Sequence, residues 1–304
     1  MPKHDGFKYF TIKEEYMTYV EMLRASPKLM FVEADTRVSY GGRTADYVPK
    51  IAIKDRFVAT SAGHLGDALE IDDSWLNKTP TENFNVELGK LHDSYNAIYQ
   101  RQFESAVLGK YGLKISDVKI GPLNEKILEH IAREAEGFAQ QGFATRFLFG
   151  GYNEAAADME IHTIRPPGIR TKLLYYGATG SGEDAGQFVL DEYFSRLHRL
   201  KPDKKNNIPA AEALYLMTHS MVSATRNIGV GGIPDLLSVT DTDIRNLGKE
   251  NSAVLFNAVK LEMDDRLTRK DVHLLAQDIF NSDGRPIKNP VIKKSKIPSE
   301  YLLG

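Results

Sequence analysis

The sequence contains no cysteine, which excludes disulfides, thiol catalysis and cysteine-rich metal sites. The redox compartment stays open, with the cytoplasm as the default location. No apolar run approaches the ~20 residues of a membrane span, and the first residues, MPKHDGFKYFTIKEEY, lack the apolar core of a secretory signal. The formal net charge of −2 gives no basic footprint for nucleic acid. We therefore expect neither a membrane nor a nucleic-acid partner.

The sequence contains no convincing pattern for a metal site or a cofactor site. The eight histidines are scattered, and no pair has metal-binding spacing with a carboxylate partner. The run GATGSG, Gly177 to Gly182, lies between a strand and a helix, where a phosphate-binding turn would lie. It comes late in the chain, however, and no acidic residue ends a second strand about 20 positions further on. We expect no cofactor and no metal.

The 304 residues, 42% hydrophobic and 26% charged, are enough for a globular chain with a sizeable core. Four strand-like runs come first: MTYVEMLR and KLMFVEAD, joined as a hairpin, then YVPKIAIK and RFVATSAG. Apolar residues then recur at three and four positions, which predicts helices over Leu65–Trp75, Val86–Lys110 and Leu123–Gln140.

Strands are predicted again at RFLFGGY, DMEIHTI and TKLLYYGA, and helices from Gly182 and Pro209. IPDLLSV and AVLFNAVKLEM are two further predicted strands. This grouping of strands and helices favours an α+β fold over an alternating parallel one. Two antiparallel sheets that face each other, with a helical layer outside each, would bury these apolar strands as a four-layer αββα sandwich.

Threonine catalysis needs a particular set of residues. A threonine hydroxyl is a weak nucleophile, but a free α-amino group, with a pKa near 8, serves as its base when threonine is the first residue. A nearby lysine lowers the proton affinity of that amine, and a carboxylate holds the lysine in place. A backbone N–H must stabilise the oxyanion.

Five segments of the chain resemble, in order, the signature blocks of proteasome β-type subunits: VEADTRVSYGG, YVPKIAIKDRFVATSAGHLGDA, FLFGGYNE, YYGATGSGEDAGQFVLDEY and TRNIGVGGIPDLLSV. Among bacterial relatives, the sequence most resembles the ancestral β-subunit family called Anbu, whose members begin Met-Thr-Tyr. The resemblance implies the N-terminal nucleophile (Ntn) hydrolase fold. It divides the chain into an extension or propeptide over residues 1–17, a proteasome-like domain over 18–264 and a C-terminal extension over 265–304.

The resemblance also implies a role for five residues. Thr18 takes the position of the nucleophile, Asp35 that of the carboxylate, and Lys50 that of the lysine, 32 positions after Thr18 as in the family. The interval from Thr18 to Asp35 is one residue longer than usual. Gly63 takes the position of the oxyanion amide, and Ser181 that of the serine near the amino group of the nucleophile.

The last block departs from the family pattern. Asn227 occupies a position where the family commonly has aspartate, and Anbu-like sequences also have asparagine there. Gly229 or Val230 occupies a position where the family commonly has serine. The loss of that hydroxyl weighs against full activity.

Each candidate residue also has an ordinary structural interpretation. Thr18 suits any strand because it is β-branched. Lys50 could face outward from an edge strand, and Asp35 could cap a turn. Ser181 precedes a predicted helix and could cap it.

The function depends on whether Thr18 becomes the first residue. Residues 1–16 could be a removed propeptide, translation could start at Met17, or the extension could stay attached and leave the site inactive. The first hypothesis is a threonine peptidase that assembles into a ring or helical oligomer and acts on peptides, with any unfoldase partner unspecified. The alternatives are an inactive proteasome-like structural or assembly protein and an Ntn amidohydrolase acting on a small molecule.

Overall fold

The computed structural model describes residues 18–40, 43–45, 50–120, 124–200, 207–227 and 230–287. The predicted extension over residues 1–17 lies outside the described residues. So does the last part of the predicted C-terminal extension, from residue 288 onward.

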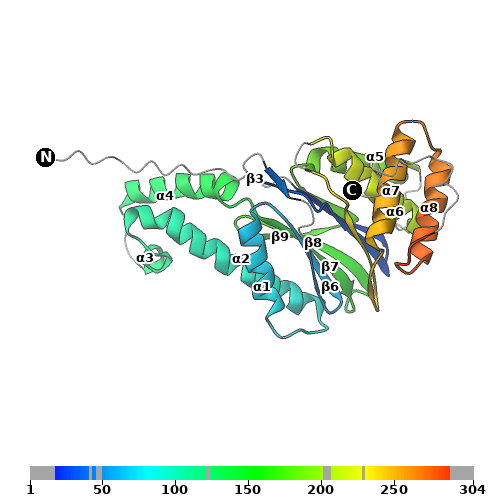
Figure 1. The fold of residues 1–304 in the computed structure, drawn as a ribbon. Coiled ribbons are helices and arrows are strands. Elements are labelled where there is room, and N and C mark those ends of the chain that lie inside the picture. The colour runs from blue at the N-terminus through cyan, green and yellow to red at the C-terminus, as the bar shows by residue number, and fades with distance from the viewer. Residues whose placement is uncertain are drawn as a thin grey trace.

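The first sheet is built around the predicted N-terminal hairpin, which the structure confirms (Figure 1). All its strand pairs are antiparallel. In spatial order its strands are β10 (Tyr176–Gly180), β1 (Tyr19–Ser26), β2 (Leu29–Ala34), β11 (Asp235–Thr240) and β12 (Ile244–Asn246).

The second sheet is an antiparallel meander in which each strand pairs with the next one along the chain. Its strands are β5 (Ile51–Lys54), β6 (Phe57–Ala62), β7 (Arg146–Asn153), β8 (Asp158–Arg165) and β9 (Ile169–Leu173). A two-stranded ribbon, β3 (Val38–Tyr40) and β4 (Arg43–Ala45), lies between β2 and β5 in the chain.

Helices cover the outer face of each sheet (Figure 1). On the second sheet lie α1 (Leu65–Leu76) and α2 (Phe84–Ala106), and the chain continues through a 3₁₀ turn (Leu108–Tyr111), α3 (Ile115–Ile120), α4 (Glu125–Gly137) and a π turn (Phe138–Gly142). On the first sheet lie α5 (Glu183–Leu200), α6 (Ala210–Ala224), α7 (Lys249–Met263) and α8 (Arg269–Asn281). The helix α8 packs on α6 and α7, so this part of the predicted C-terminal extension contributes to the core.

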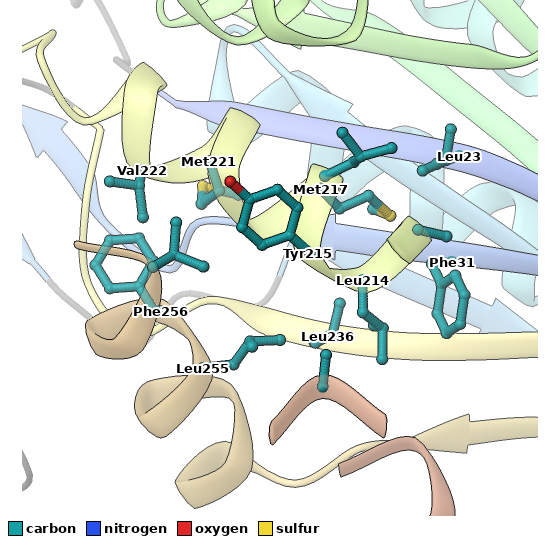
Figure 2. Packing of buried hydrophobic residues seen from close by; sticks show 14 of the residues in the cluster. Leu23, Phe31, Leu214, Tyr215, Met217, Met221, Val222, Leu236, Leu255 and Phe256 are labelled. Carbon is teal, nitrogen blue, oxygen red and sulfur yellow. The ribbon is translucent and has the colours of Figure 1, made fainter. Parts of the chain in front are cut away.

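Three apolar layers hold these elements together because successive strand residues point to opposite faces. Val20, Met22 and Val58 lie in the layer between the sheets. The second layer contains Trp75 and Phe149, beneath α1 and α2. The third lies between the first sheet and α5–α8 (Figure 2); the residues labelled there are Leu23, Phe31, Leu214, Tyr215, Met217, Met221, Val222, Leu236, Leu255 and Phe256. The predicted α+β sandwich of two antiparallel sheets is confirmed.

Two predicted strands were wrong. The run AVLFNAVKLEM belongs to α7. Its buried residues, among them Leu255, Ala258 and Val259, are nearly continuous along the chain, so periodicity could not distinguish a helix from a strand there. The run TKLLYYGA is not one strand, because it is divided between β9 of the second sheet and β10 of the first. Its middle residue Leu174 is 72% exposed where the chain crosses between the sheets.

Within the described part of the chain, none of the helices has the length and apolar character that crossing a bilayer requires.

Candidate active site

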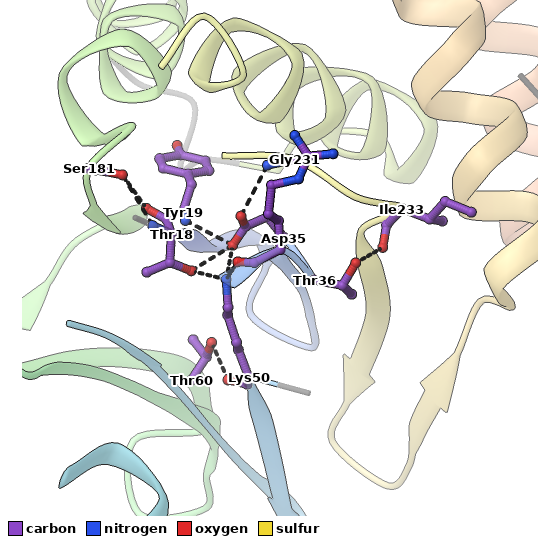
Figure 3. Close-up of polar contacts among 10 residues, drawn as sticks. Thr18, Tyr19, Asp35, Thr36, Lys50, Thr60, Ser181, Gly231 and Ile233 are labelled. Carbon is purple, nitrogen blue, oxygen red and sulfur yellow. Dashed lines mark hydrogen bonds and ion pairs between the residues drawn. The ribbon is translucent and has the colours of Figure 1, made fainter. Parts of the chain in front are cut away.

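Three strand ends bring the predicted catalytic residues together (Figure 3). Thr18 directly precedes β1 and Asp35 directly follows β2, so the hairpin register makes them neighbours, and the Asp35 N–H donates to the Tyr19 carbonyl over 2.9 Å. Lys50 directly precedes β5, in the opposite sheet. Two of the three residues therefore meet through a local hairpin, and the third only through the packing of one sheet on the other.

The three side chains form one buried cluster. Thr18 Oγ1 donates to Asp35 Oδ1 over 2.6 Å, and Lys50 Nζ lies 2.5 Å from the same carboxylate oxygen. Lys50 Nζ also donates to Thr18 Oγ1 and to the Arg37 carbonyl. The exposed fractions of Thr18, Asp35 and Lys50 are 3%, 1% and 6%. The alternative of an outward-facing lysine is therefore wrong, and the ion pair is shielded from water.

Backbone groups fix the Asp35 carboxylate. The Tyr19 N–H donates to Oδ1 over 3.0 Å, and the Gly231 N–H donates to Oδ2 over 3.2 Å. Burial raises the pKa of Asp35 above its usual value, while the positive charge of Lys50 and the hydrogen bonds from Lys50, Thr18 and the Tyr19 N–H oppose that rise. Lys50 is therefore the partner that makes a charged Asp35 tolerable at this depth.

Ser181 lies at the main chain of Thr18. Its Oγ accepts from Thr18 N over 3.1 Å and donates to the Thr18 carbonyl over 3.3 Å. Asn227 Nδ2 donates to the Ser181 carbonyl over 2.7 Å, so the amide holds the loop that presents the serine. Val230 is 2% exposed and carries no hydroxyl, and Gly229 lies outside the described residues.

Gly63 directly follows β6, the strand that pairs with β5. The Ser61 N–H donates to the Lys50 carbonyl over 3.3 Å, which places Gly63 two residues beyond the partner of Lys50. Its φ is +114°, and an added Cβ would lie 2.5 Å from the Ala144 carbonyl oxygen, so only glycine fits there. Its role as the oxyanion donor stays a prediction.

Sequence reasoning missed two groups that support the cluster. Gly231 supplies the amide to Asp35, and Thr60 Oγ1 donates to the Lys50 carbonyl over 2.8 Å. The adjacent glycines in NIGVGGIPDL were a signal for close backbone approach, whereas nothing distinguishes Thr60 from an ordinary strand threonine. Among the described residues, no cluster of histidine and acidic side chains suits a metal ion.

Gly180, the last residue of β10, packs closely against the main chain of Thr18. Its φ is +118°, and an added Cβ would lie 2.1 Å from the Thr18 carbonyl oxygen. We expect Gly180→Ala to lower the free energy of unfolding by about 1–3 kcal/mol, measured by urea denaturation. Gly89 on α2 has open space at the same position. As the control, Gly89→Ala should raise stability by roughly 0.5–1 kcal/mol; equal losses in both variants would contradict this account.

Fold and site together define a four-layer α+β sandwich with a Thr–Lys–Asp cluster at the start of its first strand. No protein-family model matches the chain, and no curated protein does. Among solved structures, the chain is similar to the Gly-1 mutant of Anbu from Hyphomicrobium sp. strain MC1. The two are 20% identical, with a TM-score of 0.49 over 75% of this chain and 87% of the other. That protein bears the name of the group that the sequence blocks resemble.

Proposed function

We propose that the protein is an N-terminal-threonine amide hydrolase of the proteasome-like kind, with residues 18–264 as its catalytic domain. The observation that carries the proposal is the convergence of the Thr18 hydroxyl, the Asp35 carboxylate and the Lys50 ammonium in one buried cluster. A lone strand threonine needs neither a buried cation nor a buried carboxylate, and burying both has a cost that a merely structural role leaves unexplained.

In the proposed reaction, the residues before Thr18 are absent and its α-amino group is free. The amine accepts the proton of Oγ1, and Oγ1 attacks the carbonyl carbon of the substrate amide. The resulting oxyanion is stabilised by a backbone N–H, for which Gly63 is the candidate. The intermediate collapses to an ester on Thr18 Oγ1, the leaving amine takes the proton, and water then hydrolyses the ester with the amine again as base.

The supporting residues have distinct tasks in this scheme. The Lys50 ammonium favours the unprotonated amine by charge repulsion and stabilises negative charge that develops on Oγ1. Asp35 holds Lys50 in place. Ser181, which contacts Thr18 N over 3.1 Å, orients the amine. The candidate substrate is a peptide, and the expected assembly is a ring or helical oligomer in the cytoplasm.

Intact mass and covalent labelling test the proposal together. We expect the purified protein to have the mass of a chain that begins at Thr18, and an epoxyketone, which is a threonine-directed electrophile, to label it at Thr18. A protein that keeps its first 17 residues and stays unlabelled would refute the proposal.

A second candidate function is an inactive structural or assembly protein. The observation that favours it is the burial of Thr18, which is 3% exposed and so leaves little access for a substrate carbonyl. The absence of a hydroxyl at Val230 points the same way. The proposal of a hydrolase for small molecules differs only in substrate, and the same labelling experiment applies to it.

A further inference from the structure

Two glutamates lie side by side in the core, outside the threonine site. Glu21 on β1 and Glu33 on β2 are directly opposite each other in the antiparallel register, and both are fully buried. Opposite residues in such a pair have Cβ atoms about 4.5–5.5 Å apart. Tyr19 and Phe31, two residues away on the same faces of their strands, belong to the apolar cluster beneath α5–α8. The two carboxyl groups therefore point into the apolar layer under the helices.

Hydroxyl groups are the polar partners of this pair. The Tyr19 hydroxyl donates to Glu21 Oε2 over 3.1 Å and lies 2.6 Å from Oγ of Ser220 on α6. The second oxygen of Glu21 and both carboxyl oxygens of Glu33 are buried without a hydrogen-bond partner. Three carboxyl oxygens are thus buried with no donor among the described residues.

Two adjacent ionised carboxylates are too costly here, because each buried ion costs several kcal/mol and like charges repel. A retained proton relieves both problems, since a protonated carboxyl can donate to its neighbour. Burial raises the pKa of Glu21 to about 8, and burial followed by the charge of Glu21 raises the pKa of Glu33 well above its usual range. Hydrogen bonds from the hydroxyls of Ser220 and Tyr19 lower the pKa of Glu21 and so oppose the effect of its burial. The group that acts on the pKa of Glu33 besides burial is Glu21.

Tyr19 connects the pair to the threonine site. Its backbone N–H donates to Asp35 Oδ1, and it directly follows Thr18. Its ring is held from a second side by α5, because a Cβ added to Gly186 would lie 2.1 Å from the Tyr19 hydroxyl oxygen. The Tyr19 side chain therefore links the acid pair to the main chain next to the nucleophile.

We propose that Glu21 and Glu33 share a proton as a hydrogen-bonded acid pair, and that this pair, through the Tyr19 hydroxyl, is the anchor that positions Thr18. Tyr19, Glu21 and Glu33 are positioning residues, and their effect on the reaction rests on the function proposed above. The shared proton itself does not depend on that function.

The pair has a defined effect of pH on stability. Both carboxyl groups bind a proton more tightly in the folded chain than in the unfolded chain, where the pKa of glutamate is about 4.3. Their stabilising effect is therefore complete below that value and is lost as pH rises through the folded pKa values, which for Glu21 is about 8. A glutamine at position 33 keeps the shape of the protonated acid and removes the part of this dependence that Glu33 contributes.

Thermal unfolding of Glu33→Gln and wild type between pH 5 and pH 8 tests the shared proton. We expect the difference in Tm, variant minus wild type, to increase by about 3 °C or more between pH 5 and pH 8. Glu129→Gln, at an exposed position on α4, should track wild type. Infrared spectra at pH 7 should contain the C=O stretch of a protonated acid that Glu21→Gln/Glu33→Gln lacks. A Tm difference that does not vary with pH, or the absence of that band, would overturn the proposal.

Tyr19→Phe tests the anchor. We expect faster amide hydrogen exchange over residues 18–26 and about tenfold slower epoxyketone labelling of Thr18, with unchanged binding of the electrophile. Tyr111→Phe, whose hydroxyl contacts Glu134 on α4, is the matched control and should change neither. Unchanged exchange in Tyr19→Phe would overturn the anchor. If wild type is not labelled at all, the proposed function fails. Amide hydrogen exchange in Tyr19→Phe still tests whether Tyr19 anchors Thr18.

Discussion

Thr18→Ala is expected to abolish amide hydrolysis and epoxyketone labelling, with a loss of about 10⁴-fold or more in turnover. The substitution removes the only atom that can form the ester, while Lys50 and Asp35 still pair with each other over 2.5 Å. The fold should persist, because the β1–β2 register and the contact between Asp35 and the Tyr19 N–H do not involve the deleted hydroxyl. Turnover of a fluorogenic peptide and the mass of the labelled protein provide the two measurements.

The control for this variant is Thr242→Ala, at an exposed turn after β11. The last residue of β11, Thr240, pairs with Leu29, at the end of β2 away from Asp35. Thr242→Ala should leave hydrolysis, labelling and the size of the oligomer unchanged. Hydrolysis that survives in Thr18→Ala would place the nucleophile elsewhere, and loss of the oligomer in that variant would mean that the threonine is structural.

Lys50→Met is expected to abolish activity and also to destabilise the fold by about 3–5 kcal/mol at neutral pH, because it leaves Asp35 buried without its cation. The pH dependence follows from the pKa of Asp35, which burial already raises and which rises further without Lys50. A carboxyl group with a raised folded pKa stabilises the fold when protonated, so the loss should shrink as pH falls toward 4. Urea unfolding at several pH values measures this.

Two further variants separate charge from packing at this site. Lys50→Met/Asp35→Asn should recover most of the stability but none of the activity, because it removes both charges from the same place. Lys28→Met breaks an ion pair with Asp241 in which the lysine side chain is 69% exposed. It should leave unfolding nearly unchanged, since exposed pairs contribute little. A Lys50→Met protein as stable as wild type would mean that Asp35 is already protonated in the native protein.

Local sequence patterns determined much of the fold. The β-branched and aromatic runs predicted β1, β2, β6, β7 and β8, and the helical spacing predicted α1, α2 and α4. The hairpin alone places Thr18 beside Asp35, because its short turn and the strand period of two fix the register. These features depend on neighbours in the chain, and for that reason a single sequence contains them.

Only the tertiary structure decided how the cluster is completed. Lys50 reaches Asp35 from the facing sheet, and the Gly231 amide comes from a loop 196 positions away in the chain. The same limit explains α7 and the division of TKLLYYGA between two sheets, because an apolar run does not specify which surface will cover it. Thr18 was identifiable as a candidate from the sequence. Its buried partners, and the acid pair Glu21–Glu33 beneath α6, depend on the packing of segments that are distant in the chain.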